Sequence, residues 1–377
     1  MEKMLSEVCD IQYGYAFDSA KFSADQGIPL IRIRDVVRGF SETYTTEVCD
    51  QEYIVNDGDI LIGMDGEFNI ARWKGGKAYL NQRVCRLLPK DEVDAMYLYY
   101  FMPKALKAIE DKTPFVTVKH LSAKELNKIV VPIPIIEEQK EIANCLQRLD
   151  ELISFRKQQL SKLDELVKSR FIEMFGTLSS NEQNFEILTI EALCSLIKDG
   201  THQTPTYTEN TINGFKFLSS KDVMTEKIDW SDIKYIPSDL HEKLYAVVKP
   251  IRNDILMSKN GVNYGVAAVN DTDEVFDIYV SLALLRPKTD IINPVYFRCA
   301  INNPDTKRQF DGSIKGIGVP NLHLGEIKKT QILVPPMDKQ IKYVSFVEQI
   351  DKSKLAIQKS LEKLETLKKA LMQKYFG

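Results

Sequence analysis

Residues 120–176 read HLSAKELNKIVVPIPIIEEQKEIANCLQRLDELISFRKQQLSKLDELVKSRFIEMFG, and residues 321–377 read NLHLGEIKKTQILVPPMDKQIKYVSFVEQIDKSKLAIQKSLEKLETLKKALMQKYFG. The two stretches align at a constant offset without a gap, and both end in Phe-Gly. Similarity at a fixed offset indicates a duplicated structural unit. We therefore interpret the chain as two copies of one arrangement.

Each copy predicts a long helix. Prolines stand just before the helix in VPIPIIEEQ and LVPPMDKQ, where a missing N–H is harmless. Acidic residues follow in the first turn, apolar residues then recur every three or four positions, and Gly176 and Gly377 suit a left-handed cap. Each helix should cover about 37 residues, or roughly 55 Å.

A helix of that length with a single apolar stripe is typical of a coiled coil. The two copies can use the same face if they pair antiparallel about a pseudo-twofold axis. The alternative is two amphipathic helices, each folded onto its own module. The residues predicted to form the coiled-coil interface are Leu149, Leu160, Leu163, Leu166, Ile350, Leu361, Leu364 and Leu367.

The rest of each half predicts a mixed, β-rich module, because turn-bounded strand patterns recur in both. The expected strands are Leu30–Ile33, Asp59–Ile62 and Val84–Leu88, then Phe215–Leu218, Asp254–Met257 and Val280–Leu285. The fold class is α+β, with two modules alternating with two long helices. The predicted divisions are 1–133 and 177–334 for the modules, and 134–176 and 335–377 for the helices.

Composition narrows the class of protein. The 377 residues carry a net charge of −3, so contact with DNA must depend on local basic patches or on a partner's charge. No apolar run approaches the roughly 20 residues of a membrane span, and the N-terminus has no secretory pattern. Six cysteines without a CxxC pair exclude a clustered zinc site and favour reduced thiols, so we expect a cytoplasmic protein.

Several motifs resemble the DNA-specificity (S) subunit of Type I restriction-modification enzymes. They are GYAFDSAKF followed by GIPLIRIRDV (14–36), KDGTHQTPTY (198–207), and the exits LNKIVVPIPIIEEQKEIA (126–143) and IKKTQILVPPMDKQI (327–341). The resemblance covers the whole chain. The second exit departs from the usual acidic-Gln pair, having Lys339 before Gln340.

The resemblance implies a non-catalytic subunit. Each module would be a target-recognition domain that reads one half of a split, asymmetric site in double-stranded DNA. The helices would set the spacer and dock two methyltransferase subunits, which restriction subunits can join. The chain itself would hold no cofactor or metal, since S-adenosylmethionine would be bound by the methyltransferase partner.

Candidate DNA contacts come from basic and polar loops. Residues 68–86 contain five basic side chains and no acid, and arginine, asparagine and glutamine can read base edges while lysine and arginine neutralise phosphates. Arg32 and Arg34 alternate with Ile31 and Ile33, so the alternative to DNA contact for both is a place on the solvent-exposed face of a strand. The candidates are Arg32, Arg34, Arg72, Lys74, Lys77, Asn81, Arg83, His202, Gln203, Thr204, Tyr207, Lys259, Asn260, Asn263, Tyr264 and Lys315.

Three alternatives stay open. The first is an enzyme, an adenine methyltransferase or nuclease that carries its own recognition domain. Asn293-Pro294-Val295-Tyr296 approaches the Asn-Pro-Pro-Tyr loop of amino-methyltransferases, but its counterpart Asp94-Ala95-Met96-Tyr97 does not, and a helix start explains both sequences. The chain could serve a related restriction-modification system with a similar reader subunit. It could also be a coiled-coil adaptor without DNA readout, which would need no basic loops in its modules.

Overall fold

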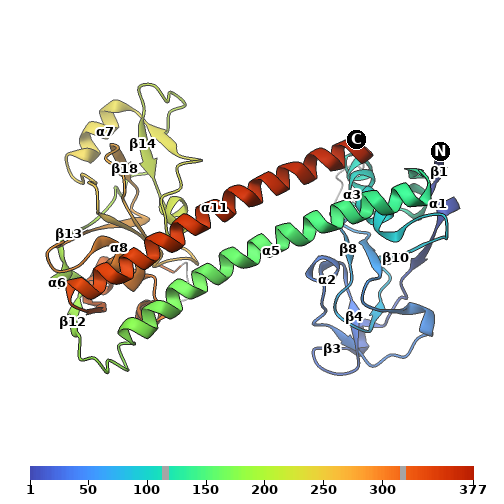
Figure 1. Cartoon of the computed structure of the whole chain (residues 1–377), viewed down its shortest axis with the longest axis horizontal. Helices are drawn as coiled ribbons and strands as arrows, with labels where there is room; N and C mark the ends of the chain where they lie inside the picture. Colours follow the sequence, from blue (N-terminus) through green and yellow to red (C-terminus); the bar gives the residue numbers. More distant parts are fainter. Residues whose placement is uncertain (113–118, 315–319) are drawn as a thin grey trace. The chain divides into compact units, whose positions relative to one another are not determined.

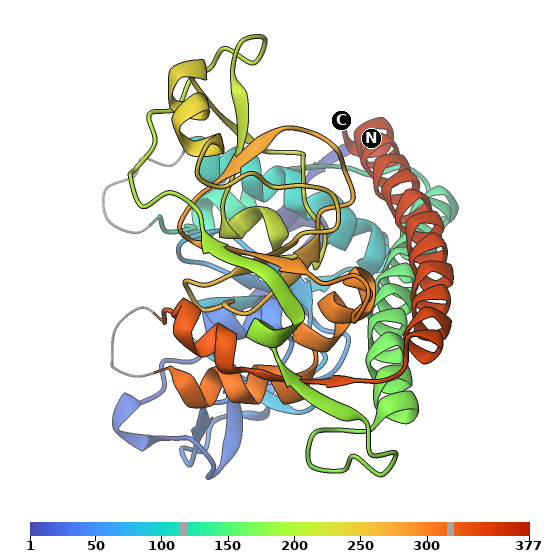
Figure 2. The same ribbon diagram turned by 90° about the vertical axis from the view of Figure 1, so that its left-hand side faces the viewer.

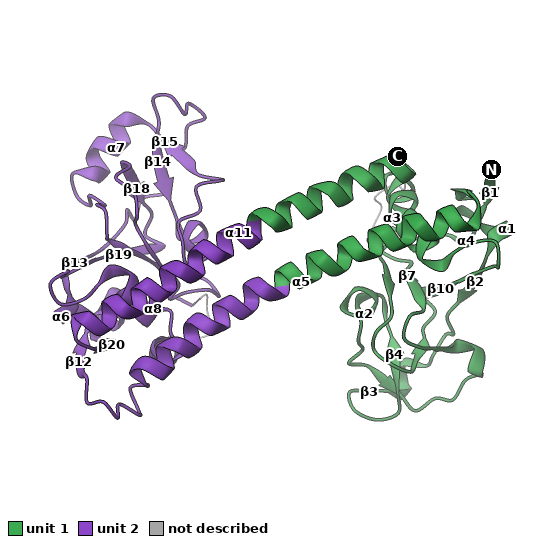
Figure 3. Ribbon diagram, in the orientation of Figure 1, with its two compact units in different colours: residues 1–157, 359–377 green, residues 158–358 purple. Residues whose placement is uncertain are grey.

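The computed structural model of this chain describes residues 1–112, 119–314 and 320–377. It contains two compact units, each assembled from separate parts of the sequence (Figure 3). Unit 1 comprises residues 1–157 and 359–377, and unit 2 comprises residues 158–358. The four-part division expected from the sequence therefore stays a prediction, because the compact units divide both long helices near their middles.

Unit 1 is built on a four-stranded antiparallel sheet in the order β2-β10-β7-β8, with a second sheet in the order β3-β5-β4-β9-β6. The short pair β1-β11 lies where the module joins its long helix. The strands are β1 (Glu2–Met4), β2 (Cys9–Tyr13), β3 (Phe22–Ser23), β4 (Ile28–Ile31), β5 (Tyr44–Thr45), β6 (Ile54–Val55), β7 (Ile60–Gly63), β8 (Ile70–Arg72), β9 (Ala78–Leu80), β10 (Val84–Pro89) and β11 (Val130–Pro132). The helices of the module are α1 (Leu5–Val8), α2 (Ile33–Arg38), α3 (Ala95–Lys112) and α4 (Ala123–Asn127), with single 3-10 turns at Ser19–Lys21 and Gln51–Tyr53.

Unit 2 repeats this plan with the sheets β13-β19-β16-β17 and β15-β14-β18 and the pair β12-β20. Its strands are β12 (Glu186–Thr189), β13 (Cys194–Asp199), β14 (Phe215–Leu218), β15 (Lys234–Ile236), β16 (Ile255–Ser258), β17 (Ala267–Val269), β18 (Phe276–Ile278), β19 (Leu282–Pro287) and β20 (Gln331–Val334). Its helices are α6 (Ile190–Leu193), α7 (Ser238–Tyr245), α8 (Pro294–Ile301), α9 (Pro304–Ser313) and α10 (Leu324–Lys329), with a 3-10 turn at Ser220–Val223.

The strand ladders fix which residues correspond between the units. Tyr13 pairs with Cys85 in unit 1, and Asp199 pairs with Ala283 in unit 2, at the same point of the same ladder. All six strands expected from the sequence are present, with ends that differ by no more than two residues. The predicted α+β class is confirmed.

Two 40-residue helices, α5 (Ile136–Phe175) and α11 (Met337–Phe376), follow the two modules (Figure 1). They lie side by side in both views (Figure 2) and run antiparallel. In unit 1, Lys157 pairs with Glu365 at 3.0 Å, while in unit 2 the hydroxyl of Tyr343 donates to the carbonyl of Val167 at 3.1 Å. No helix of the described residues is long and apolar enough to cross a membrane.

The sheltered side chains of both helices follow a heptad, with spacings that alternate between four and three. In α5 the seam positions are Ile142, Leu146, Leu149, Ile153, Arg156, Leu160, Leu163 and Val167. In α11 they are Tyr343, Val347, Ile350, Lys354, Ile357, Leu361, Leu364 and Lys368.

This register corrects the sequence prediction for two leucines. Leu166 and Leu367 are 45% and 47% exposed, and the seam passes instead through Val167 and Lys368. Lys368 is held there because its ammonium pairs with Asp150, which also accepts from the hydroxyl of Tyr100 at 2.8 Å. The other six predicted interface residues lie at seam positions.

The phenylalanine of the repeated Phe-Gly packs into the core at the same place in each unit. The ring of Phe376 lies 5.4 Å from that of Tyr97 in the unit 1 core, and the ring of Phe175 lies 5.1 Å from that of Tyr296 in the unit 2 core. Gly176 follows with φ of +74°, the left-handed conformation predicted for a cap. Each unit is therefore completed by the end of the helix that follows the other module.

The repeated glutamine after each proline exit is a buried clamp. Gln139 accepts from the backbone N–H of Asp94 at 2.9 Å and donates to the carbonyls of Glu92 and Pro134. Gln340 makes the corresponding bonds to Asn293, Ile291 and Pro335, and both side chains are fully buried. The Lys339 that precedes Gln340 leaves this contact intact.

Candidate nucleic-acid interface

The basic run of unit 1 divides into exposed and buried parts. Arg72, Lys74 and Lys77 are exposed, and the first two line an open hollow of about 310 Å³ with Asp57, Gly58 and Trp73. The indole N–H of Trp73 donates to the carbonyl of Gly76 at 2.6 Å, and the N–H of Gly76 donates to Asp57 at 2.7 Å. The buried tryptophan thus fixes the loop that presents the three cations.

Arg86 belongs to the same run but faces the protein. Its guanidinium donates to Asp59 at 2.9 Å, to Gln12 and to the carbonyls of Glu52 and Ile54. Its donors are therefore used to join β10 to β2, to β6 and to the turn before β6.

Arg32 and Arg34 do not lie on a strand, which corrects the sequence interpretation. The carboxylate of Asp35 accepts from the N–H of Arg32 at 2.9 Å, so the chain turns into α2 directly after β4. Both arginines are exposed, and Arg34 donates to the hydroxyl of Thr43 at 3.2 Å. Asp35, the third residue of α2, stabilises the start of this helix. The helix therefore forms although the apolar-polar alternation of IRIR is typical of a strand.

Unit 2 brings together two loops that are distant in sequence. The ammonium of Lys259, after β16, lies 2.5 Å from a carboxylate oxygen of Asp199 at the end of β13. Lys259 is only 5% exposed. His202 lies beside this pair, with Nε2 3.7 Å from the second oxygen of Asp199. Lys259 therefore joins the loops, while His202, Gln203 and Thr204 are the exposed side chains there.

Two candidate tyrosines are held by lysines. The ammonium of Lys307 lies 3.4 Å from the ring centre of Tyr264, whose hydroxyl donates to Asp311 at 2.5 Å. The ammonium of Lys234 lies 4.4 Å from the ring centre of Tyr207, which is 44% exposed. Each places a cation on an aromatic face at the surface.

Five further candidates complete the set. Asn263 is exposed, while Asn81 and Asn260 are half-buried. Asn81 bridges to Tyr15, and Asn260 bridges to Asn321. Arg83 is treated with its neighbours below, and Lys315 lies outside the described residues.

Comparison with known proteins places this arrangement in a family. A sequence model described as the Type I restriction modification DNA specificity domain matches residues 1–165 and again 184–369. The chain belongs to this family. The two matches correspond to the two copies of the repeat, so this member of the specificity family carries the domain twice.

Its relatives carry the same name. The chain is 27% identical to the Escherichia coli Type I restriction enzyme EcoBI specificity subunit, over 99% of this chain and 84% of that protein. It is 22% identical to the MjaVIII specificity subunit of Methanocaldococcus jannaschii, over 91% and 87% of the two chains. The crystal structure of the S subunit from M. genitalium has the same fold, with a TM-score of 0.59 at 16% identity, over 100% of this chain and 96% of that one.

The Asn-Pro-Val-Tyr sequence is a helix start, as predicted. The side chain of Asn293 accepts from the N–H groups of Val295 and Tyr296 at 2.9 and 3.3 Å. The hydroxyl of Tyr296, which is fully buried, donates to Leu333 at 2.8 Å. Asp94 caps α3 in the same way in unit 1, so both motifs are used by the fold of this specificity-family member.

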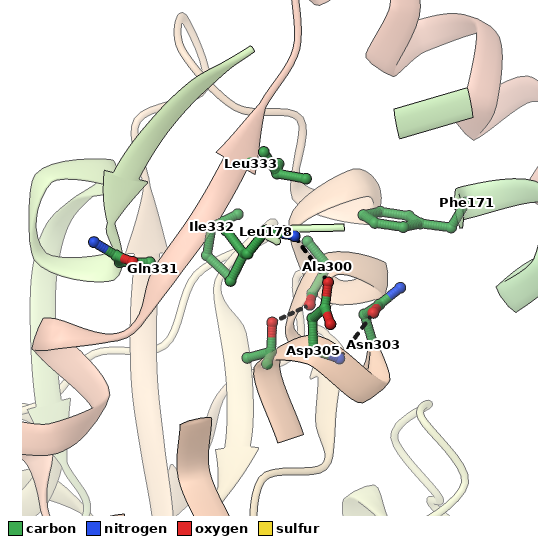
Figure 4. Close-up of a pocket in the computed structure, with 9 residues that line it drawn as sticks. Phe171, Leu178, Ala300, Asn303, Asp305, Gln331, Ile332 and Leu333 are labelled. Carbon is green, nitrogen blue, oxygen red and sulfur yellow. Dashed lines mark hydrogen bonds between the residues drawn. The ribbon is translucent and has the colours of Figure 1, made fainter. Parts of the chain in front are cut away.

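A cavity of about 20 Å³ in unit 2 is a packing gap (Figure 4). Asp305 accepts from the N–H of Leu178 at 2.9 Å, Asn303 accepts from the N–H of Asp305, and Thr306 donates to Ala300. Each of these polar side chains already has a partner, and the volume is that of one water molecule. The gap offers no group for recognising a ligand.

A larger pocket of about 410 Å³ opens beside the Lys259–Asp199 pair. Asp199, Thr201, His202 and Asp277 line it together with aliphatic side chains of α7 and its neighbours. Asp277 is 1% exposed and accepts from Nδ1 of His241 at 2.6 Å, and burial raises the pKa of this carboxyl. No sequence pattern indicates this pair, because its members lie 36 residues apart.

Proposed function

We propose that this chain is the DNA-reading subunit of a Type I restriction-modification complex and has no catalytic activity of its own. One observation carries this: two units with the same strand order in their central sheets present different exposed side chains on their loops. At the end of β8 unit 1 offers Arg72, Lys74 and Lys77, whereas the corresponding segment after β17 of unit 2 offers the exposed Asp271, Asp273 and Glu274. Unit 2 presents His202, Gln203 and Thr204 on another loop, after β13. Each unit reads one half of a split double-stranded site, and the unlike loops make the two halves different.

The exposed candidates contact DNA directly, while Lys259 acts by holding its loop. Lysine and arginine neutralise phosphates, and the amide and imidazole side chains reach base edges. With a net charge of −3, the chain alone binds DNA weakly. A basic partner that closes around the duplex supplies the remaining affinity.

The long helices dock two methyltransferase subunits, which restriction subunits can join. Apolar side chains are exposed on both helices away from the seam, including Leu152 and Phe155 in α5 and Leu355 and Leu367 in α11. Exposed apolar surface of this kind is typical of a protein interface. S-adenosylmethionine is bound by the methyltransferase, and the complex works in the cytoplasm.

Mapping of N6-methyladenine tests this function. The genome of the source cell is sequenced for methylated adenine with the gene intact, deleted, and restored. We expect loss and recovery of methylation at one split, non-palindromic motif. An unchanged map would overturn the proposal and favour a coiled-coil adaptor without DNA readout.

A related restriction-modification system is the second candidate, since the reader subunit alone does not define the complex. Purification of the tagged chain from the source cell separates the two. A Type I assembly yields separate methyltransferase subunits with this chain. A single polypeptide carrying both methylation and cleavage would favour the related system.

A further inference from the structure

Three equivalent backbone hydrogen bonds join the same three segments in both units. In unit 1 the N–H of Met64 donates to Arg83 at 3.0 Å, that of Leu121 to Met64 at 2.8 Å, and that of Gly66 to Lys119 at 2.9 Å. In unit 2 the corresponding bonds run from Lys259 to Ser281, from Leu322 to Lys259, and from Gly261 to Pro320, at 2.8, 2.8 and 3.0 Å. The two frames are therefore the same in backbone.

The side chains on these frames differ at three corresponding positions. Unit 1 carries Asp65, Arg83 and His120, and unit 2 carries Asn260, Ser281 and Asn321. The β-bridge of Asp65 with His120 corresponds to the β-bridge of Asn260 with Asn321. A trio that contains an Arg–Asp ion pair in unit 1 thus stands where unit 2 has three uncharged side chains.

Both other members of the trio of unit 1 lie against Asp65. Nδ1 of His120 lies 2.6 Å from one oxygen of Asp65, and Nε of Arg83 lies 3.5 Å from the other. The side chain of Arg83 is 53% exposed, and no hydrogen bond from its two terminal amino groups reaches any of the described residues. Within the described residues, the Nε side of the guanidinium therefore faces Asp65 and its two terminal amino groups have no partner.

The surface beside the trio is open to a ligand. Gly66 and Gly261 follow the frame with φ of +76° and +86°, and a Cβ on either would meet nothing within 4 Å. A glycine in this conformation and with open space allows close approach by another backbone.

We propose that Arg83 reads a guanine in the half-site of unit 1, with Asp65 and His120 as its positioning residues. The planar guanidinium matches O6 and N7 of guanine in the major groove with two parallel hydrogen bonds. Asp65 fixes the orientation of this fork, and His120 fixes Asp65. The neutral trio of unit 2 lacks such a fork, so its half-site differs at the corresponding base pair. This inference rests on the proposed function.

The test uses the complex reconstituted from the full chain and its methyltransferase subunits on a library of random DNA. Methylated products are sequenced for the wild type, Arg83→Lys, Asp65→Asn and the triple variant Asp65→Asn/Arg83→Ser/His120→Asn. For the triple variant we expect the preference for guanine at one position of one half-site to fall about tenfold to a hundredfold. Arg83→Lys should lower it by a smaller factor, because an ammonium can donate to guanine but has no planar fork. The other half-site should be unchanged.

Asp65→Asn should weaken the same preference by a smaller factor, and Asp65→Glu should restore part of it. A purely structural role would instead lower methylation at every sequence alike. Lys3→Ser is the matched control, because it removes another cation of unit 1 that pairs with a carboxylate, Glu92, and should leave the motif as it is.

Replacement of each guanine in turn by 7-deazaguanine keeps the test decisive if the Arg83 variants lose all activity. The wild-type complex should then bind about tenfold more weakly at one guanine only, because N7 is missing. The inference is overturned if the triple variant leaves every base preference unchanged, or if no single guanine responds. A wild-type complex without any split motif would instead contradict the proposed function itself.

Discussion

The ammonium of the buried Lys259 and the carboxylate of the partly buried Asp199 form an ion pair where unit 1 has two uncharged side chains. The shared frame matches Lys259 with Met64, and the sheet ladders match Asp199 with Tyr13. Removal of one member of a buried pair leaves an uncompensated charge, whereas replacement of both by packed apolar groups can be neutral.

We therefore expect Lys259→Met alone to lower the free energy of unfolding by about 3 kcal/mol. The double variant Asp199→Tyr/Lys259→Met should recover most of that loss. Urea unfolding measures both, and the exposed pair Arg252–Asp273 is the control, since Arg252→Met should cost less than about 1 kcal/mol. Equal stability of wild type and Lys259→Met would show that this pair does not hold the two loops.

The buried clamp gives a second prediction. Gln139→Ala leaves the N–H of Asp94 and the carbonyls of Glu92 and Pro134 without their partner, so it should cost about 2 kcal/mol. Gln340→Ala should cost a similar amount in unit 2. Gln147→Ala is the control, because this exposed glutamine bonds only to Glu151 one turn away. Thermal unfolding decides, and a clamp variant as stable as the control would refute the assignment.

Much of this fold could be predicted from the sequence, because the decisive signals are local. The starts and ends of the long helices, the caps at Asp94 and Asn293 and the six strands all depend on residues that are close in sequence. The internal repeat contains each of these signals twice. The exchange of helix ends between units could not be derived in this way, since it depends on where Phe175 and Phe376 find partners.

The candidate site was less predictable because its contacts are long-range. Lys259 and Arg86 look like free surface cations in sequence, yet their partners Asp199 and Asp59 lie 60 and 27 residues away. Asp65 and His120 carry no recognisable sequence signal, because only the folded frame brings them to Arg83. In the helices, an apolar residue is expected at every seam position, so the sequence predicts Leu367. The seam passes instead through Lys368, which pairs with Asp150.

The heptad register yields a third prediction. Leu149 is 7% exposed on the seam and Leu166 is 45% exposed beside it. Leu149→Ala should lower the free energy of unfolding by about 2 to 4 kcal/mol, whereas Leu166→Ala should cost less than about 0.5 kcal/mol. Chemical denaturation of both variants measures this. The reverse order would mean that the seam runs through Leu166 and not through Leu149 and Val167.

Thiol labelling gives a fourth prediction. Burial raises the pKa of Cys9, Cys85 and Cys194 to about 12, so very little thiolate exists at about pH 8. In the native chain at that pH these three should resist a thiol reagent for hours, while all six cysteines react in urea. Mass spectrometry of the labelled peptides identifies each site. Native labelling of Cys85 at the rate of the unfolded chain would contradict its place in the core.

The helices give the last prediction, because each of them supplies residues to both units. Insertion of seven residues after Lys157 in α5 and after Gln358 in α11 adds one heptad to both helices and keeps every seam position in register. Seven residues add about 10 Å of helix, which corresponds to about three base pairs. Methylation mapping should then find both half-sites unchanged and a spacer about three base pairs longer.

An insertion in α5 alone is the control. It makes one helix longer than the other, so that seam residues of α5 no longer face their partners in α11, and it should abolish methylation. Methylation of the original motif by the double insertion would show that the helices do not set the spacer.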